Sequence, residues 1–257
     1  MPVSLSLADQ HAFIRDGLVI RRGLVPGRLL QAATARIDDW YQRHLNTARI
    51  ENYTQKTFAP ELGDHPDLLA LYTGCDVHHI AAQLVHPARL APVTSVQVQI
   101  RIPERALDAP QPVKTMHVDG VACPHLEPRE LRTFTLLAGV ILSPVTSADH
   151  GAMHYLPGGH HRMARWFATE RADDTAEQVP ADVEAEPGVP LLGEPGDVVF
   201  MHHLVPHRVG ANTSDHPRIM AYFRLSHIDH DQLVLPALRD PWTEYPHLGA
   251  LAAAGGA

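Results

Sequence analysis

The sequence lacks the features that mark disulfide-bonded, secreted and membrane-spanning proteins. Its two cysteines, Cys75 and Cys123, are too few for a disulfide framework and have no zinc-ligand spacing. No apolar run approaches the length that crosses a bilayer, and residues 1–4 show neither the basic segment nor the apolar core of a secretory leader. We therefore expect a soluble, cytoplasmic protein that does not associate with a membrane.

Positive charge is also scarce. The 257 residues include 21 lysines and arginines against 29 aspartates and glutamates, so the formal net charge is −8. A chain of this sign has no general surface for a nucleic acid, and we expect no nucleic-acid partner. The same balance favours a neutral or cationic small-molecule substrate. The oligomeric state is not indicated by these features.

Hydrophobic residues make up 45% of the chain, which is enough for a core, and no repeat or low-complexity block divides it. We predict one domain over 1–257. Helix signals come first, with a helix over about 6–15 that Gly17 ends and a second helix from Pro26 through Trp40. The predicted parts are a helical segment over about 6–90, a mainly β core over about 93–227 and a C-terminal tail over 228–257.

Strand signals follow from about position 93. Residues 96–102 alternate between apolar and polar side chains, as in a half-buried strand. Gln97, Gln99 and Arg101 therefore share one face, which points either into the fold or into solvent. Prolines and glycines separate further predicted strands at 114–119, 133–142, 153–156, 197–202 and 218–225.

The segment His117-Val118-Asp119 is the clearest candidate for a metal site. Two histidines and one carboxylate form the facial triad that holds non-haem Fe(II) and leaves coordination positions open. Residues two apart on a strand point the same way, so His117 and Asp119 can face one metal. The third ligand must come from elsewhere, and His207, which follows the apolar run 196–201, is the candidate.

Nineteen histidines make chance pairs common, and three other pairs have this spacing: His65 with Asp67, His125 with Glu127 and His227 with Asp229. The first pair flanks a proline and the second lies between two prolines. Proline removes a donor from the strand ladder, which argues against both. The third pair lies near the C-terminal end, where few histidines remain to complete a site. It is disfavoured but stays an alternative.

Arg218 follows His207 by eleven residues and opens the apolar run 219–223. An arginine among buried strand neighbours needs an anionic partner, because an unpaired buried charge is very costly. The sequence therefore predicts an anion site on this strand.

These motifs, in their order and spacing, resemble the phytanoyl-CoA dioxygenase family of Fe(II)/2-oxoglutarate-dependent oxygenases. The N-terminal stretch 13–20 is also similar to the family's opening helix and strand, and the resemblance extends to about position 226. The matching motifs are His117-Val118-Asp119, the segment 151–160, Gly196-Asp197-Val198-Val199-Phe200, and His207 followed by Asn212, Ser214 and Arg218.

The resemblance implies a mainly β fold with flanking α-helices, built as a double-stranded β-helix, the jelly-roll barrel shared with cupins. It implies that His117, Asp119 and His207 bind Fe(II) and that Arg218 pairs with the C5 carboxylate of the co-substrate 2-oxoglutarate. The implied activity uses O2 to oxidise an unactivated C–H bond, by hydroxylation, oxidative ring closure or desaturation, while 2-oxoglutarate becomes succinate and CO2.

One position departs from the family pattern. The family often has a serine two residues after the distal histidine, where this chain has Val209. A usual contact to the co-substrate is thereby put in doubt. Thr135, on the strand that follows the ligand pair, is a candidate to replace it through its hydroxyl. Gln99 is a further candidate if its strand face points into the fold.

The motif residues do not identify the substrate. A short acidic chain without a basic patch for an acyl-CoA favours a small natural product, including a sugar or aminosugar scaffold. We expect it to bind between the barrel mouth and the segments 108–114, 121–132 and 227–245. The alternative class is a non-catalytic cupin-like barrel that binds a metal or a sugar. A His-x-His pair with a following glutamate would favour that class, and the sequence has none.

Overall fold

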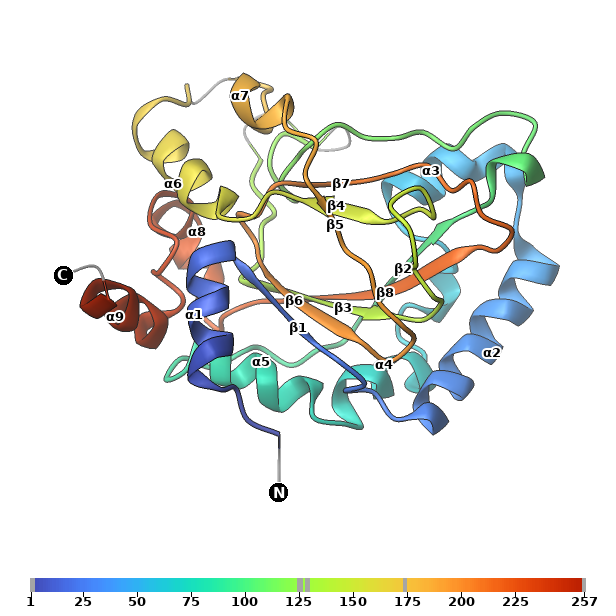
Figure 1. Cartoon of the computed structure of the whole chain (residues 1–257), viewed down its shortest axis with the longest axis horizontal. Coiled ribbons are helices and arrows are strands. Elements are labelled where there is room, and N and C mark those ends of the chain that lie inside the picture. The colour runs from blue at the N-terminus through green and yellow to red at the C-terminus, as the bar shows by residue number, and fades with distance from the viewer. Residues whose placement is uncertain (1–2, 124–126, 128–129, 173–174, 256–257) are drawn as a thin grey trace.

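The computed structural model describes residues 3–123, 127, 130–172 and 175–255 (Figure 1). The α-helices are α1 Leu7–Asp16, α2 Gly27–His44, α3 Ile50–Gln55, α4 Pro66–Thr73, α5 Val77–Val85, α6 Gly159–Thr169, α7 Ala181–Glu184, α8 His230–Arg239 and α9 Pro246–Gly255. The strands are β1 Leu18–Arg21, β2 Gln97–Arg101, β3 Leu136–Ile141, β4 Met153–Tyr155, β5 Val189–Pro190, β6 Val198–His202, β7 His207–Val209 and β8 Arg218–Leu225.

The two N-terminal helices form where the sequence predicts them. Ser6 caps α1, because its hydroxyl accepts a hydrogen bond from the Asp9 amide at 3.1 Å while the Asp9 carboxylate accepts one from the Ser6 amide at 2.9 Å. Gly17 ends the helix in the left-handed conformation, with φ at +80°. Pro26 precedes α2, which continues through His44.

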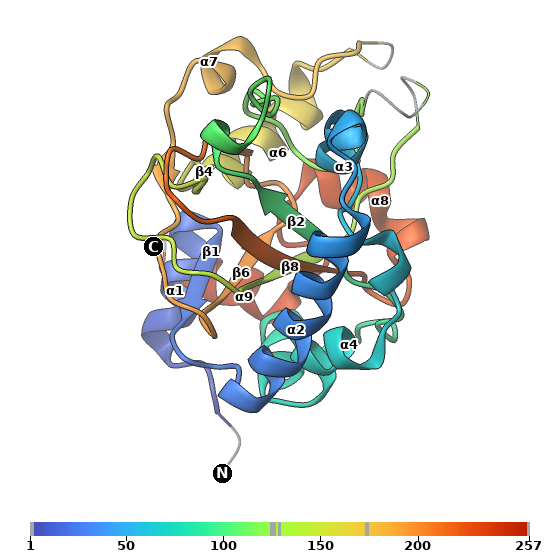
Figure 2. The same ribbon diagram turned by 90° about the vertical axis from the view of Figure 1, so that its right-hand side faces the viewer.

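The strands form two antiparallel sheets that pack face to face (Figure 1). The larger sheet has the order β1-β6-β3-β8-β2 and the smaller has the order β5-β4-β7. Helices α2, α4 and α5 cover the other face of the larger sheet (Figure 2). The architecture is therefore mainly β with flanking helices, and its two facing sheets are those of a jelly roll. The described strands form two separate sheets and not one closed barrel.

Strand patterns in the sequence follow from what each sheet face meets. Every residue of β3 is buried, because Leu136 and Ala138 pack on the helices while Leu137 and Ile141 pack between the sheets. The edge strand β2 alternates instead, since its apolar residues face the helices and its polar residues line a cavity between the sheets. The polar face of β2 thus points into the fold.

The strand predicted over 114–119 is wrong except at one residue. His117 forms a single antiparallel bridge with His207, in which each amide donates to the other's carbonyl at 3.0 and 2.9 Å. Pairing stops there because Asp119 and Gly120 turn the chain, and Gly120 has φ at +79°. A Cβ at Gly120 would lie 2.2 Å from the Arg132 carbonyl oxygen, so the turn requires glycine.

The segment predicted as a C-terminal tail is mostly helical. Helix α8 packs against α6, and α9 packs against α5 and α1. Within the described ranges, no helix combines the length and the apolar character that crossing a bilayer requires.

Three buried histidines join β6 to α6 beneath this C-terminal segment. The ring centroids of His160 and His202 lie 5.3 Å apart, and those of His202 and His203 lie 4.5 Å apart. Burial lowers the pKa of His160 to about 3, that of His203 to about 4 and that of His202 well below its usual value. All three rings are therefore neutral in the folded protein at neutral pH.

We expect this cluster to make the protein acid-sensitive. The unfolded chain binds protons at these histidines as the pH falls below about 6.5, while the folded chain does not until about pH 4. The free energy of unfolding should then fall across this window by up to about 1.4 kcal/mol per pH unit for each histidine. Urea denaturation at several pH values measures the slope. His160→Leu should reduce it, whereas the same change at exposed His161 should not, and equal slopes would contradict the assignment.

Candidate metal and co-substrate site

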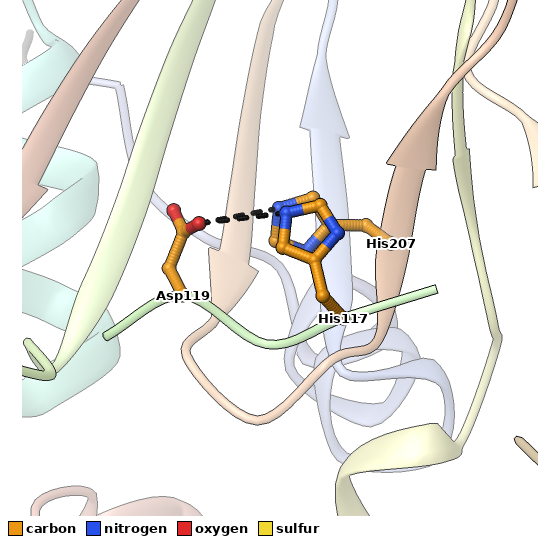
Figure 3. A group of neighbouring side chains, drawn as sticks. All are labelled: His117, Asp119 and His207. Carbon is orange, nitrogen blue, oxygen red and sulfur yellow. Dashed lines mark ion pairs between the residues drawn. The ribbon is translucent and has the colours of Figure 1, made fainter. Parts of the chain in front are cut away.

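The structure brings His117, Asp119 and His207 together at the end of the jelly roll where β7 begins (Figure 3). One potential ligand atom from each residue lies within 4.8 Å of the other two. The Oδ1 atom of Asp119 is 3.7 Å from the Nε2 atom of His117 and 4.0 Å from the Nε2 atom of His207. Two nitrogens and one oxygen thus converge on a point that a metal ion could occupy.

Backbone contacts fix the orientation of both imidazole rings. The Nδ1 atom of His117 is 3.0 Å from the Thr115 carbonyl oxygen, and the Nδ1 atom of His207 is 3.0 Å from the Val205 carbonyl oxygen. A carbonyl only accepts, so each Nδ1 carries a proton, and each Nε2 faces Asp119 as the ring nitrogen that a metal could bind. Metal-binding histidines commonly have this arrangement, in which one ring nitrogen donates to a backbone carbonyl and the other faces the metal.

Burial and charge hold these groups in the protonation states that a metal needs. Burial, with the neighbouring His207, lowers the pKa of His117 to about 4, so its ring is neutral at neutral pH. Burial alone would raise the pKa of the Asp119 carboxyl, but Arg224 and the two histidines outweigh it and keep that pKa well below its usual range. The donor set is therefore a carboxylate and two imidazole nitrogens, which suits Fe(II).

Arg224 holds the second oxygen of the metal-site carboxylate. Its Nη2 atom donates to Oδ2 of Asp119 at 2.7 Å, and its guanidinium lies over the Phe134 ring at 5.5 Å. Oδ1 is left to face the histidines. Sequence reasoning did not predict this role, although Arg224 shares a strand face with Arg218, six residues earlier on β8.

We expect Arg224→Leu to weaken Fe(II) binding by about 10- to 100-fold, because partners that orient metal ligands contribute on this scale. Competition with a chromogenic chelator under anaerobic conditions measures the affinity. Arg132→Leu is a matched control, since Arg132 also borders the site but pairs with Glu130. Equal iron affinity in the two variants would show that the Asp119 carboxylate needs no such partner.

An inner cavity of about 90 Å³ extends from the three ligands to Arg218 between the sheets. The Arg218 side chain is fully buried, and its Nε atom donates to the Gly151 carbonyl at 2.7 Å. Its Nη1 and Nη2 atoms are buried and have no hydrogen-bond partner among the described residues. Such unpaired donors are costly, and a carboxylate in the cavity would satisfy both at once.

A second buried arginine lies directly opposite. Arg101 on β2 is the cross-strand neighbour of Arg218, and its Nη atoms donate to the carbonyls of Pro112 at 2.7 Å and Gln111 at 3.2 Å. Burial and the charge of Arg218 lower the pKa of Arg101 to about 10. Gly151 lets both side chains pack this closely, because a Cβ there would lie 2.8 Å from the Arg101 Cβ. The inner cavity is therefore strongly electropositive.

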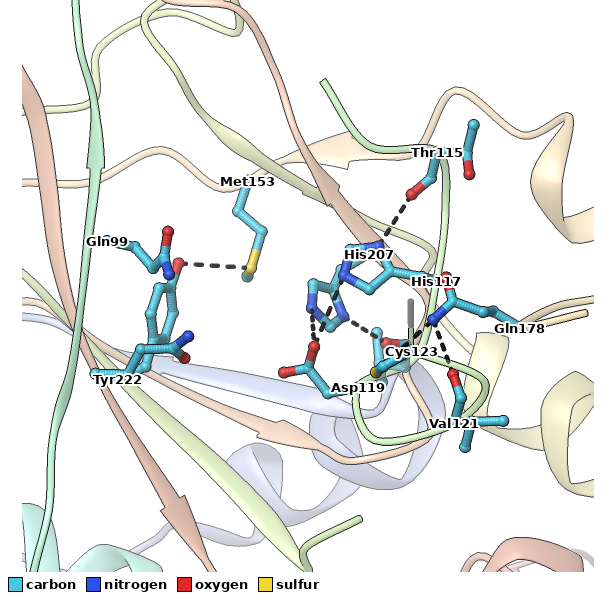
Figure 4. Close-up of polar contacts among 12 residues, drawn as sticks. Gln99, Thr115, His117, Asp119, Val121, Cys123, Met153, Gln178, His207 and Tyr222 are labelled. Atoms are coloured by element: carbon cyan, nitrogen blue, oxygen red, sulfur yellow. Dashed lines mark hydrogen bonds and ion pairs between the residues drawn. The ribbon is translucent and has the colours of Figure 1, made fainter. Parts of the chain in front are cut away.

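Gln99, Tyr222 and Val209 also line the inner cavity. Gln99 and Tyr222 lie on one side of the ligand cluster, opposite Cys123 and Gln178 (Figure 4). The Tyr222 hydroxyl lies 3.2 Å from the sulfur of Met220, which is a weak acceptor, and it also interacts with the Arg218 guanidinium. Tyr222 was not predicted from the sequence, although the period of two on β8 places it on the face of Arg218.

The placement of Thr135 does not agree with a co-substrate contact. Its hydroxyl accepts a hydrogen bond from the His227 amide at 2.7 Å, and its side chain lines neither cavity at the site. Thr135 precedes β3, where the chain turns toward the C-terminal helices, and its carbonyl accepts from the Tyr245 hydroxyl at 2.5 Å. Its role is therefore structural. A hydroxyl that does interact with Arg218 in the inner cavity belongs to Tyr222.

An outer cavity of about 630 Å³ adjoins the ligands on the solvent side. Loop residues between 112 and 132 line it, as expected, but the described residues of 227–245 do not. Helix α3 and the turn after it form the opposite wall in their place. The C-terminal helices pack against α6, α5 and α1 instead.

The alternative histidine pairs do not form metal sites among the described residues. The His65 ring caps α4 by accepting from the Asp67 amide at 3.2 Å. The His227 ring accepts from the Asp229 amide at 2.9 Å and finds no third ligand. His125 lies outside the described residues.

The fold and the site together define a jelly-roll protein whose two histidines and one carboxylate are placed to hold a metal ion, the arrangement of non-haem iron oxygenases. The family model of phytanoyl-CoA dioxygenase matches residues 13–220. The chain therefore belongs to the phytanoyl-CoA dioxygenase family. No curated protein matches the sequence.

Solved structures with the same fold come from several enzymes. The non-haem α-ketoglutarate-dependent carbocyclase SnoK from nogalamycin biosynthesis is 22% identical, with a TM-score of 0.63 over 86% of this chain and 83% of that one. EctD from S. alaskensis with bound Fe is 16% identical, with a TM-score of 0.62 over 88% and 78%. HygX from Streptomyces hygroscopicus with nickel and 2-oxoglutarate is 14% identical, with a TM-score of 0.58 over 87% of both chains.

Proposed function

We propose that this protein is an Fe(II)- and 2-oxoglutarate-dependent oxygenase that oxidises an unactivated C–H bond of a small molecule. The observation that carries the proposal is the pair of unpaired Nη atoms of Arg218 in a cavity that ends at His117, Asp119 and His207. 2-Oxoglutarate has a carboxylate at each end. One end fits the metal position, and the other fits the arginine.

Each residue has a defined task in this reaction. His117, Asp119 and His207 would hold the iron, with Arg224 orienting the carboxylate. Arg218 would bind the C5 carboxylate of 2-oxoglutarate, supported by the charge of Arg101. Iron bound here supplies the chemistry that couples decarboxylation of 2-oxoglutarate by O2 to oxidation of the substrate.

The protein's own contribution is binding, orientation and the exclusion of water. Leu137, Met153 and Val209 form the apolar part of the inner cavity's lining, which keeps water away from that side of the co-substrate. Gln99 and Tyr222 are polar side chains that line the cavity with Arg218, and they would fix the orientation of the co-substrate. Val209 offers no hydrogen bond where relatives often have serine, and Tyr222 would supply one.

The outer cavity is the proposed substrate site. Its volume lies within the range of pockets that bind drug-sized molecules. SnoK acts in nogalamycin biosynthesis, and HygX has been solved with hygromycin B, so two proteins of this fold handle natural-product scaffolds. We therefore propose a natural-product substrate, including a sugar or aminosugar scaffold, that undergoes hydroxylation or oxidative ring closure.

Succinate release tests the proposal. The purified protein, given Fe(II), ascorbate, O2 and a panel of candidate metabolites, should convert 2-oxoglutarate to succinate, and mass spectrometry should find a product heavier by one oxygen or lighter by two hydrogens. Removal of iron by a chelator should stop both. A non-catalytic cupin-like barrel, the alternative class, would bind metal or a sugar without consuming 2-oxoglutarate.

A further inference from the structure

Lysine is rare in this chain: of its 21 lysines and arginines, two are lysines, Lys56 and Lys114. Both lysines line the outer cavity. Only a small part of the chain borders this cavity, so random placement would rarely bring both lysines there. Lys114 also lines the inner cavity and precedes the first metal ligand by three residues. The two ammonium groups therefore belong to the same opening.

The other cations of the outer cavity already have partners. Arg132 donates to Glu130 at 2.5 Å, and Arg224 donates to Asp119 at 2.7 Å. Neither lysine forms an ion pair with any residue that the structure describes, and Glu51 is the remaining carboxylate at the rim. The outer cavity thus carries two unpaired positive charges in a protein whose formal net charge is −8.

The wall that carries Lys56 is tied to the sheet that carries the site. The Lys56 carbonyl accepts hydrogen bonds from the side chains of Gln97 and Gln99, the latter at 2.9 Å. Helix α3 contacts β2 directly (Figure 2). The backbone at Lys56 is thereby anchored, while its exposed side chain is free to reach into the cavity.

We propose that the substrate carries an anionic group, a carboxylate or a phosphate, that the ammonium groups of Lys56 and Lys114 bind in the outer cavity. The inference rests on the proposed function and specifies the substrate of that same site. It reverses the expectation of a neutral or cationic substrate, because the charge that a ligand meets is that of the cleft and not that of the whole chain. A compact ammonium on a flexible stem suits a terminal anion of either shape.

Two anionic probes and one neutral probe test the proposal with the holoprotein. Inorganic phosphate, benzoate and benzamide are titrated into the anaerobic protein with Fe(II) and saturating 2-oxoglutarate, and the metal-to-ligand charge-transfer band is followed. We expect phosphate or benzoate to perturb the band with an affinity at least about tenfold above that of benzamide. A response to phosphate indicates that the site binds a phosphate group, and a response to benzoate indicates that it binds a carboxylate.

Lys56→Gln combined with Lys114→Gln should weaken binding of the responding anion by about tenfold or more. The double variant Arg28→Gln with Arg239→Gln is the matched control, because it removes the same charge from exposed positions that line neither cavity. Anions that bind no better than benzamide, or equally well to both double variants, would overturn the proposal. The proposal would also be overturned if the lysine double variant bound 2-oxoglutarate more slowly but bound the anionic probe as before, because the lysines would then attract the co-substrate and not the substrate.

Lysine labelling separates this proposal from the proposed function. The two lysines and the N-terminus are the primary amines of the chain, so acetylation read by peptide mass mapping reports directly on the cavity. Phosphate or benzoate should protect both lysines even without iron. Protection without a charge-transfer band would support anion binding and refute the oxygenase, whereas a normal band without protection would refute the anion site alone.

Discussion

His117→Ala and His207→Ala should each abolish iron-dependent turnover. Loss of a metal ligand costs more than loss of its hydrogen-bond partner, so iron affinity should fall by more than about 100-fold. The expectation rests on the convergence of the two Nε2 atoms on Asp119 Oδ1, at 3.7 and 4.0 Å. Anaerobic chelator competition measures iron binding, and succinate release from 2-oxoglutarate measures turnover.

The control for these variants is His65→Ala. His65 belongs to a second His-x-Asp pair, but its ring only caps α4 through the Asp67 amide. This variant should keep iron binding and lose only part of its helix stability, about 1 kcal/mol. Circular dichroism should show a folded protein in all three cases. Turnover at the wild-type level in either ligand variant would place the iron elsewhere.

Arg218→Ala should weaken 2-oxoglutarate binding by about thirtyfold or more. Truncating one partner of a buried, hydrogen-bonded charge pair costs about 2 to 5 kcal/mol, and each 1.4 kcal/mol is about a factor of ten. The structure supplies the reason, since both Nη atoms are buried without a partner and only Nε is used, by Gly151. Titrating 2-oxoglutarate into the anaerobic Fe(II) protein and following the charge-transfer band gives the affinity.

Arg218→Lys should recover part of the affinity, because lysine keeps the charge but loses the planar fork that matches a carboxylate. Iron affinity should be nearly the same in both Arg218 variants, which is the opposite of the result expected for Arg224→Leu. Substitution of Arg218 should therefore lower the affinity for 2-oxoglutarate, and substitution of Arg224 should lower the affinity for iron. An unchanged midpoint for 2-oxoglutarate in Arg218→Ala would instead move the anchor to Arg101.

Much of the site is encoded in short-range patterns. The pair His117 and Asp119, the distal His207 and the anchor Arg218 could be chosen because ligand type and spacing constrain metal chemistry strongly. The alternation along β2 placed Gln97, Gln99 and Arg101 on one face but left its direction open, and the structure shows that this face lines the inner cavity. Prediction of strand 114–119 failed because two residues of the same face can meet a metal from a turn as well as from a strand.

Other parts of the site depend on contacts that no local pattern encodes. Thr135 was a candidate because it lies next to a strand of the site. In the structure, its hydroxyl accepts a hydrogen bond from the His227 amide and its carbonyl accepts one from the Tyr245 hydroxyl. The pairing of Arg224 with Asp119 joins residues 105 positions apart. The period of two assigns side chains to a face of one strand, but it does not say which strands become neighbours.

The sequence alone gave the fold class, through its resemblance to a known family, and it singled out His117, Asp119, His207 and Arg218 as the candidate ligands and anchor from residue type and spacing. Only the tertiary structure decided that Arg101 faces Arg218, that α3 and not the C-terminal helices forms the outer wall, and that both lysines meet at one opening. The reason is physical. Strand order and helix packing set which distant segments share a cavity, and the charge of that cavity is a sum over segments that the sequence keeps apart.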